Sequence, residues 1–423
     1  MITLGAAQFS FANECLPNNY ILIHGIGGTP KDFGHMGTAI ERQLPCARVY
    51  EFSYDTANSN LSTLDFAKSL KAFIAKIPKQ KQKEINLIMH SQGGIVGLTY
   101  IMNSYDNRNG FEKTDLERLN SYVSASTPFW GSDFALMGKE ILFGPGIDEN
   151  LFSPFGAIQL NDMKYGSLSN QKLSAALSNK SNNDFIKYFK GLKTLNISGM
   201  APYSRNLPSE FSHQFFEGDL VVNTPSMTLN SIQIETKKKY NNNAVDRPMH
   251  KSSKLSEQAY AIGTHIDANF DAPGYGIIDV PRRCINLARC DHPGYLSLYQ
   301  FLVNGIVKSN LEVKDIVKGF EAQIKVQLPK GMKNKNDLRV KVLNNFESGL
   351  VMSNYRFKGT NVSSINVSNG QAFFLLKGSI FSKIESNIIR VKIFQPEVSS
   401  RIIDIYIEKG LVTHLSTNVN LRK

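Results

Sequence analysis

The first two thirds of the chain alternate short apolar runs with amphipathic stretches of helical period. Between two of these runs, apolar positions recur every three to four residues over 66–77, as on one face of a helix. Strands that alternate with helices build a parallel sheet covered by helices, so the pattern predicts an α/β fold. The runs expected to form strands are residues 20–24, 49–53, 85–90, 122–125 and 194–199.

After about residue 309 the pattern changes to strict alternation of apolar and polar positions. Residues 322–328 alternate in this way, and residues 403–407 repeat the scheme. Such alternation predicts half-buried strands and an all-β, sandwich-like module. We therefore expect an α/β domain over 1–308 and a basic β-rich domain over 309–423.

Two longer segments interrupt the α/β pattern. Residues 133–190 are rich in Gly, Ser and Asn with scattered apolar patches, and they lie where an enzyme of this architecture would carry a lid. Residues 236–256 contain runs of Lys and Asn and are expected to form a solvated loop.

Composition and charge narrow the class of protein. The 423 residues are 42% hydrophobic and 20% charged, which is typical of a globular chain with room for two domains. Of the net charge of +12, residues 311–423 supply +9, from 18 Lys and Arg against 9 Asp and Glu. This surplus would attract an anionic membrane surface, or it is only a lysine-rich solvated surface. We expect no nucleic-acid partner.

Targeting signals and cysteines give a consistent picture of location. The first twelve residues lack a basic region and an adequate apolar core for a signal peptide, and no apolar run has the length of a membrane span. We expect a cytoplasmic protein, or one secreted by a non-Sec route into a host cell. The scattered cysteines, which predict buried thiols in a reducing compartment, are Cys15, Cys46, Cys284 and Cys290.

A serine stands between an apolar run and a helical run, in the segment Leu87–Gly94. A serine on so sharp a strand-to-helix turn projects its hydroxyl at the carboxyl edge of the sheet, which makes Ser91 the candidate nucleophile. The helix behind it points N–H groups and a positive dipole end at developing negative charge. The segment departs from the G-x-S-x-G pattern because Met89 replaces the first glycine.

A glycine-rich segment, His24-Gly-Ile-Gly-Gly-Thr29, follows the first predicted strand. In acyl-transfer enzymes of this fold, that position forms half of an oxyanion hole. The backbone N–H groups of Ile26 and Gln92 could converge on the oxyanion. A phosphate-binding loop is disfavoured, because the segment lacks the Lys-Ser/Thr ending.

Three motifs occur in order: HGIGG, then HSQGG about 65 residues later, then STPFWGS at 126–132. In these motifs residues 18–308 resemble the bacterial lipases and, more loosely, the SidB-type lipase-like effectors of intracellular bacteria. The resemblance implies an α/β-hydrolase fold with a mostly parallel sheet, and a serine esterase that acts on lipids.

A serine hydrolase also needs a histidine and a carboxylate, which follow the nucleophile in the order acid, then histidine. The best carboxylate is Asp219, in a segment similar to the D-G-x-V-P-x-x-S segment of lipases, although a turn or helix-cap role is the alternative. For the base we favour His292, which precedes a helical pattern, over His265, which lacks one. His250 and His414 are poorly placed.

The remaining histidines and the absence of metal motifs complete the prediction. His24 and His90 precede the required position and are expected to be packing and hydrogen-bonding residues. No metal or organic cofactor is expected, since the chain has no HExxH, CxxC pair or EF-hand loop. The predicted function is hydrolysis of carboxylic esters of lipids. Alternatives are a thioesterase or amidase, or an inactive lipase fold that binds a membrane or a protein.

Overall fold

A computed structural model describes most of the chain. The described residues are 18–79, 84–132, 135, 156–178, 183–201, 218–219, 221–236, 245–265, 276–307, 309, 319–327, 338–342, 361–362, 364–368, 371–379, 387–395 and 399–418.

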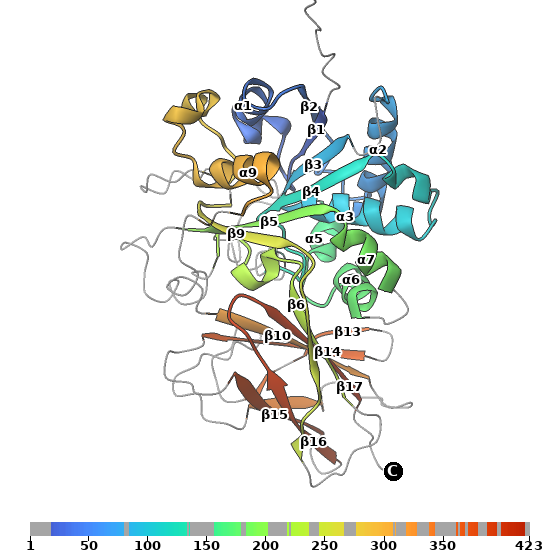
Figure 1. Ribbon diagram of the computed structural model, residues 1–423. Coiled ribbons are helices and arrows are strands. Elements are labelled where there is room, and N and C mark those ends of the chain that lie inside the picture. The colour runs from blue at the N-terminus through green and yellow to red at the C-terminus, as the bar shows by residue number, and fades with distance from the viewer. Residues whose placement is uncertain are drawn as a thin grey trace, which may run out of the picture.

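Six parallel strands form the central sheet in the order β2-β1-β3-β4-β5-β9 (Figure 1). Five of them are the predicted strands, and the α/β-hydrolase class is confirmed. The sixth, β9, lies at the edge beside β5 and was not predicted. The strands are β1 (Asn18–Ile23), β2 (Ala47–Phe52), β3 (Ile85–His90), β4 (Leu119–Ala125), β5 (Lys193–Met200) and β9 (Glu257–Ile262).

Helices cover both faces of this sheet, because alternate residues of its strands are apolar on both sides. In β1, Ile21 and Ile23 belong to one buried cluster, whereas Tyr20 and Leu22 belong to another. The first cluster includes residues of α2 (Thr63–Lys76), α3 (Gln92–Tyr105), α6 (Leu168–Ser178) and α7 (Asn183–Lys190). The second includes residues of α1 (Met36–Gln43) and α9 (Pro293–Asn304).

The described end of the predicted lid segment is part of the scaffold. It holds α5 (Ala157–Asp162), α6 and α7. Leu173 of α6 and Phe189 of α7 are buried in the core cluster against the sheet. These helices are therefore no lid, and the rest of the predicted lid segment, mainly residues 136–155, lies outside the described residues.

Two further sheets face each other in a sandwich, as the alternating C-terminal pattern predicts. Their orders are β13-β14-β10-β17-β6-β8 and β12-β11-β15-β16-β7. A buried apolar cluster contains residues of both sheets, among them Ile324 and Ile403. The C-terminal strands are β10 (Gly319–Gln327), β11 (Arg339–Val342), β12 (Asn361–Val362), β13 (Ser364–Ser368), β14 (Gln371–Ser379), β15 (Ile388–Gln395), β16 (Ser399–Tyr406) and β17 (Val412–Asn418).

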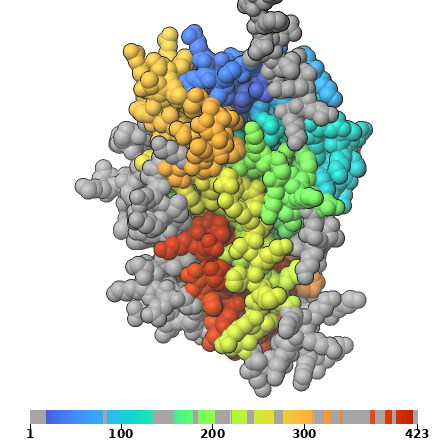
Figure 2. All heavy atoms as spheres, in the orientation of Figure 1, coloured from blue at the N-terminus to red at the C-terminus, as the bar shows by residue number. Residues whose placement is uncertain are grey.

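Strands that precede residue 309 complete this sandwich. β6 (Ser231–Glu235) pairs in parallel with β17, and its residues lie beside the C-terminal strands on the surface (Figures 1 and 2). β8 (His250–Ser253) pairs with β6, and β7 (Val245–Asp246) pairs with β16. The boundary at 308 thus does not separate the sheets. The solvated-loop prediction for 236–256 is wrong where β7 and β8 lie.

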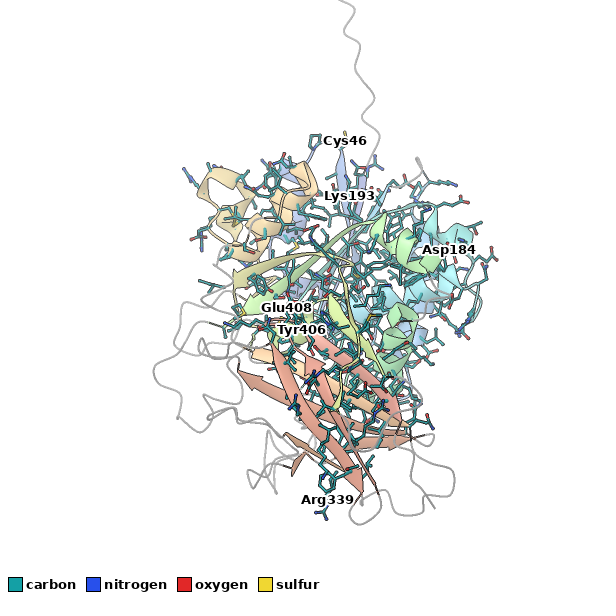
Figure 3. All side chains as sticks on the ribbon, turned by 60° about the horizontal axis from the view of Figure 1, so that its bottom comes forward. Cys46, Asp184, Lys193, Arg339, Tyr406 and Glu408 are labelled. Atoms are coloured by element: carbon teal, nitrogen blue, oxygen red, sulfur yellow. A yellow bond between two sulfur atoms is a disulfide. The ribbon has the colours of Figure 1, made fainter. Side chains whose placement is uncertain are left out.

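The structure also corrects the prediction for the cysteines. Cys284 and Cys290 form a disulfide, Cys46 is disulfide-bonded as well, and no cysteine among the described residues is a free thiol. Disulfides persist in oxidising compartments, so the cysteines do not support a reducing one. Cys46 lies at the end of the molecule opposite to Arg339 of the sandwich (Figure 3).

Within the described ranges, no helix combines the length and apolarity of a membrane span.

Candidate active site

Ser91 occupies the turn between β3 and α3 with φ 52° and ψ −126°. Positive φ is strained for a residue with a side chain, and such strain is held in place only by close packing. The neighbours supply that packing: a Cβ atom on Gly93 would lie 2.5 Å from the carbonyl oxygen of Ile23. On Gly25 it would lie 2.8 Å from the Cβ atom of Ser91. The strand, the turn and the glycine-rich loop thus meet at Ser91.

Met89, which replaces the first glycine of the G-x-S-x-G pattern, is accommodated by the helix. Its side chain is fully buried, and a Cβ atom on Gly97 of α3 would lie 2.3 Å from its Sδ atom. Gly97, in the second turn of the helix, therefore leaves the space that the methionine fills. The departure from the pattern does not disturb the turn.

A chain of hydrogen bonds links Ser91, His265 and Asp219. The Oγ atom of Ser91 lies 2.8 Å from Nε2 of His265, whose Nδ1 lies 2.6 Å from Oδ2 of Asp219. With the Nδ1–H group donating to the carboxylate, Nε2 is free to accept the proton of the serine hydroxyl. All three side chains are buried.

The carboxylate of Asp219 is held in place by its own loop. Its Oδ1 atom accepts hydrogen bonds from the backbone N–H groups of Val221 and Val222, at 3.1 and 2.9 Å. Its backbone carbonyl accepts from the N–H group of His265 at 2.9 Å. Asp219 therefore fixes both the ring and the backbone of His265.

The preference for His292 over His265 is wrong in geometry. His292 is fully buried as the N-cap of α9, where its Nδ1 accepts from the backbone N–H of Tyr295 at 3.0 Å. Its Nε2 donates to the carbonyl of Gly276 at 3.0 Å. Both ring nitrogens are thus occupied away from Ser91. The loop-histidine-helix pattern that favoured His292 is the signature of this cap.

His265 lies just beyond the carboxyl end of β9, at the same edge of the sheet as Ser91 after β3. The apolar run Ala259–Ile262, which forms most of that strand, is the sequence feature that indicates its position. Because the neighbouring segment was interpreted as a loop, the strand was not predicted. Without this strand, His265 could not be assigned to the edge of the sheet at which Ser91 lies.

The glycine-rich loop beside Ser91 is anchored by the segment that follows β2. The backbone N–H of Gly27 donates to Oγ1 of Thr56 at 2.9 Å, and the Tyr54 hydroxyl donates to the carbonyl of His24 at 2.6 Å. The rings of His24 and Tyr54 stack at 4.4 Å, and burial lowers the pKa of His24. Sequence reasoning placed His24 as a packing residue, as observed, but missed Tyr54 and Thr56.

His90 packs behind the base. Its ring centroid lies 4.6 Å from that of His265, and burial, followed by the charge of His265, holds its pKa well below the ordinary value. His90 is therefore neutral. A neutral neighbour adds no charge that would oppose protonation of His265 during catalysis.

A cavity of about 490 Å³ opens beside Ser91 and His265. Ile26, Ala135 and Met163 line one part of it, and they pack with Ile95 into a small apolar cluster. Lys31 and Asp279 line another part. Nowhere in the described part of the chain do three or more His, Cys, Asp or Glu side chains gather as metal ligands would.

One of the two residues predicted for the oxyanion hole lines this cavity, and the other directly follows the nucleophile. Ile26 lines it directly, and Gln92 follows Ser91 as the first residue of α3. The N-terminus of an α-helix carries free N–H groups and partial positive charge. The arrangement can therefore bring a hydroxyl nucleophile, a base and hydrogen-bond donors to one carbonyl group.

Comparisons with known proteins agree with this fold. Residues 19–189 match the profile of a family described as "Putative serine esterase (DUF676)", and no curated protein matches the chain. Phospholipase PlaB from Legionella pneumophila shares the structure over 95% of this chain and 93% of its own, with 14% identity and a TM-score of 0.69. Its structure in complex with thio-NAD gives 15% identity, coverage of 95% and 94%, and a TM-score of 0.66. At such identity the likeness concerns the fold alone, and the fold is that of an α/β-hydrolase.

Proposed function

We propose that this protein is a serine hydrolase that cleaves carboxylic ester bonds of lipids. The observation that carries the proposal is the hydrogen-bonded chain from Asp219 through His265 to Ser91 at the wall of a cavity. Nucleophile, base and orienting carboxylate are the three parts that acyl transfer by serine requires.

In this mechanism Ser91 attacks the acyl carbonyl while His265 takes the hydroxyl proton. The backbone N–H groups of Ile26 and Gln92 stabilise the oxyanion. His265 then gives the proton to the leaving alcohol, and an acyl-serine remains. A water molecule, deprotonated by His265, hydrolyses this ester and restores the free serine, while Asp219 stabilises the imidazolium in both steps.

The apolar wall of the cavity favours an acyl chain as the group that is bound. Ile26, Ala135 and Met163 offer apolar surface to such a chain within the same cavity as Ser91. The esterase description of the matching family and the name of the similar phospholipase point to ester substrates of the same class. A phospholipid or an acylglycerol is therefore the proposed substrate.

Substrate profiling of the purified full chain tests this proposal. We expect hydrolysis of p-nitrophenyl esters and of phospholipid or acylglycerol micelles, with much lower rates on acyl thioesters and acyl amides. Ser91→Ala is the matched control. Higher rates on the thioester would replace the proposal by a thioesterase. The lack of any activity above Ser91→Ala would favour an inactive lipase fold.

We also propose that the basic surplus of residues 311–423 draws the enzyme to anionic lipid. Each basic residue near such a surface contributes about 1 kcal/mol at low salt. Co-sedimentation of the full chain should be strong with phosphatidylserine vesicles, weak with phosphatidylcholine vesicles, and lost as salt is added. Equal binding to both kinds of vesicle at all salt concentrations would contradict this attraction.

A further inference from the structure

The sandwich contacts the catalytic part beside the loop that carries Asp219. β10 provides the contact through two buried polar side chains, Glu321 and Gln323, which are two residues apart and so point to the same face. The Gln323 side chain donates to the backbone carbonyl of Trp130 at 2.8 Å, and Trp130 packs against His414 of β17 with ring centroids 4.3 Å apart. This interface is therefore a packed one.

Glu321 accepts two further hydrogen bonds, one of them from the loop that carries Asp219. Its Oε1 atom accepts from the Tyr165 hydroxyl at 3.3 Å, and its Oε2 atom accepts from the Ser226 hydroxyl at 3.3 Å. The side chain of Glu321 is 1% exposed, so both bonds are shielded from water. Water therefore does not compete with the two hydroxyl groups for the carboxyl oxygens of Glu321.

The same bonds continue to Asp219. The Asn223 side chain donates to the Tyr165 hydroxyl at 3.2 Å, so Tyr165 joins Glu321 to the loop. Asn223 directly follows Val222, whose backbone N–H donates to Oδ1 of Asp219, and it pairs with Gly218 on the other side of the aspartate. The loop is thus tied to the sandwich at two points, Asn223 and Ser226.

We propose that Glu321 is a positioning residue for catalysis, through which the C-terminal sandwich holds the Asp219 loop against His265. The inference rests on the proposed function. It makes the sandwich part of the active-site architecture: the carboxylate that orients the base is itself oriented by a carboxylate from another sheet. Hydrolysis then depends on the docked sandwich even for small soluble esters.

Glu321→Leu tests the proposal, because leucine fills similar space and cannot accept the two bonds. We expect kcat for a short p-nitrophenyl ester to fall by about tenfold to a hundredfold with little change in KM, as for misplaced catalytic groups. The acid limb of the pH profile should move to lower pH, since an imidazole whose carboxylate partner has shifted away from it protonates less readily. Among the described residues, Asp219 bonds to the ring of His265, His90 packs against it with a pKa that burial holds well below the ordinary value, and Lys31, Asp32 and Asp279 line the same cavity.

Two further variants make the result decisive. Gln323→Leu removes a bond of the same interface that ends on the backbone carbonyl of Trp130 and on no side chain of the Asp219 loop, so it should lower the melting temperature while leaving kcat and the acid limb unchanged. Glu321→Gln keeps one acceptor oxygen and puts an NH2 donor in place of the other, to which a hydroxyl oxygen can accept, so it should recover part of the kcat lost in Glu321→Leu. Trp130 is the single tryptophan, and its emission reports whether the sandwich stays docked in each variant.

The outcomes separate this inference from the proposed function. A wild-type enzyme that hydrolyses the ester, with Glu321→Leu and Gln323→Leu equal in kcat and in acid limb, overturns the role of Glu321 and leaves the serine mechanism standing. Loss of kcat in both variants together with altered Trp130 emission assigns the effect to the interface as a whole and also overturns it. A wild-type protein without esterase activity refutes the proposed function first.

Discussion

The Nε2 atom of His265 lies 2.8 Å from the Oγ atom of Ser91, although 174 residues separate them in the chain. Parallel strands bring this about, because the carboxyl ends of β3 and β9 lie at one edge of the sheet. Ser91 follows the first of these strands and His265 the second. The order of the strands in the sheet therefore determines which histidine lies beside Ser91. The residue pattern of a single segment does not reveal that order.

His265→Ala should abolish ester hydrolysis while leaving the fold intact. Members of a catalytic triad act as a unit, so the expected loss in kcat is about a thousandfold or more. The melting temperature should change little.

His292→Ala is the counterpart and should behave in the opposite way. Its two ring nitrogens hold the start of α9 and the carbonyl of Gly276, so the loss of a buried cap should lower stability by about 1–2 kcal/mol. The folded fraction should retain most of its kcat. If His292→Ala were inactive yet as stable as the wild type, His265 would no longer be the base.

Asp219→Asn should lower kcat by about a thousandfold or more, because an amide no longer fixes the tautomer or stabilises the imidazolium. The two backbone N–H groups that donate to Oδ1 can still donate to the amide oxygen, so folding should be preserved. Steady-state kinetics with circular dichroism as the folding control checks this. Activity within about tenfold of the wild type would remove Asp219 from the triad.

Most of the scaffold could be predicted from the sequence. Five of six strands of the parallel sheet, the elbow at Ser91 and the alternating C-terminal strands followed from local periodicity and turn chemistry, which are properties of short segments. The sandwich strands β6 and β7 did not, because they pair with partners more than 140 residues away: Ser231 lies opposite Val412, and Val245 lies opposite Ile402. Pairing over such distances leaves no local signal.

The site was predictable to the same extent. Ser91 and Asp219 stand in short motifs that can be recognised from the sequence alone. In the structure both side chains lie within hydrogen-bond distance of His265. The choice of histidine failed because a helix N-cap and a catalytic turn both place a histidine before a helix. Tyr54, Thr56 and Glu321 act through tertiary contacts alone, and nothing in their own segments marks them.

Gly25→Ala should impair catalysis without unfolding the protein. A Cβ atom at this position would lie 2.8 Å from Cβ of Ser91 and 3.2 Å from Nδ1 of His90, so the loop that carries Ile26 must move away from the nucleophile. We expect kcat to fall by about tenfold to a hundredfold, as for the loss of an oxyanion donor.

Gly37→Ala serves as the control for this substitution. Gly37 lies in α1, where the nearest contact of an added Cβ atom would be a Val49 methyl group at 3.3 Å. Its kinetics should match those of the wild type. Equal kinetics for Gly25→Ala and the wild type would contradict the close fit of the loop.

Acid should destabilise the protein below about pH 6.5, the ordinary pKa of histidine. Burial lowers the pKa of His414 to about 3, and burial also lowers the pKa of His24, His90 and His292. Between these values the unfolded chain binds protons that the folded chain does not, so stability falls as pH falls.

His414→Phe should flatten this dependence. Phenylalanine keeps a ring against Trp130 and does not titrate, and among the described residues the Nε2 atom of His414 has no hydrogen-bond partner to lose. Melting curves followed by Trp130 emission from about pH 7 to about pH 5 should show a smaller drop for the variant than for the wild type. Parallel curves would show that His414 does not contribute.

Labelling with a fluorophosphonate probe, followed by mass spectrometry of the modified peptide, tests the central claim most directly. Such a probe reports an activated serine without knowledge of the substrate. We predict a single modified residue, Ser91, in the wild type, no labelling in Ser91→Ala, and strongly reduced labelling in His265→Ala but not in His292→Ala. Undiminished labelling of Ser91→Ala, or labelling that depends on His292 rather than His265, would contradict the account.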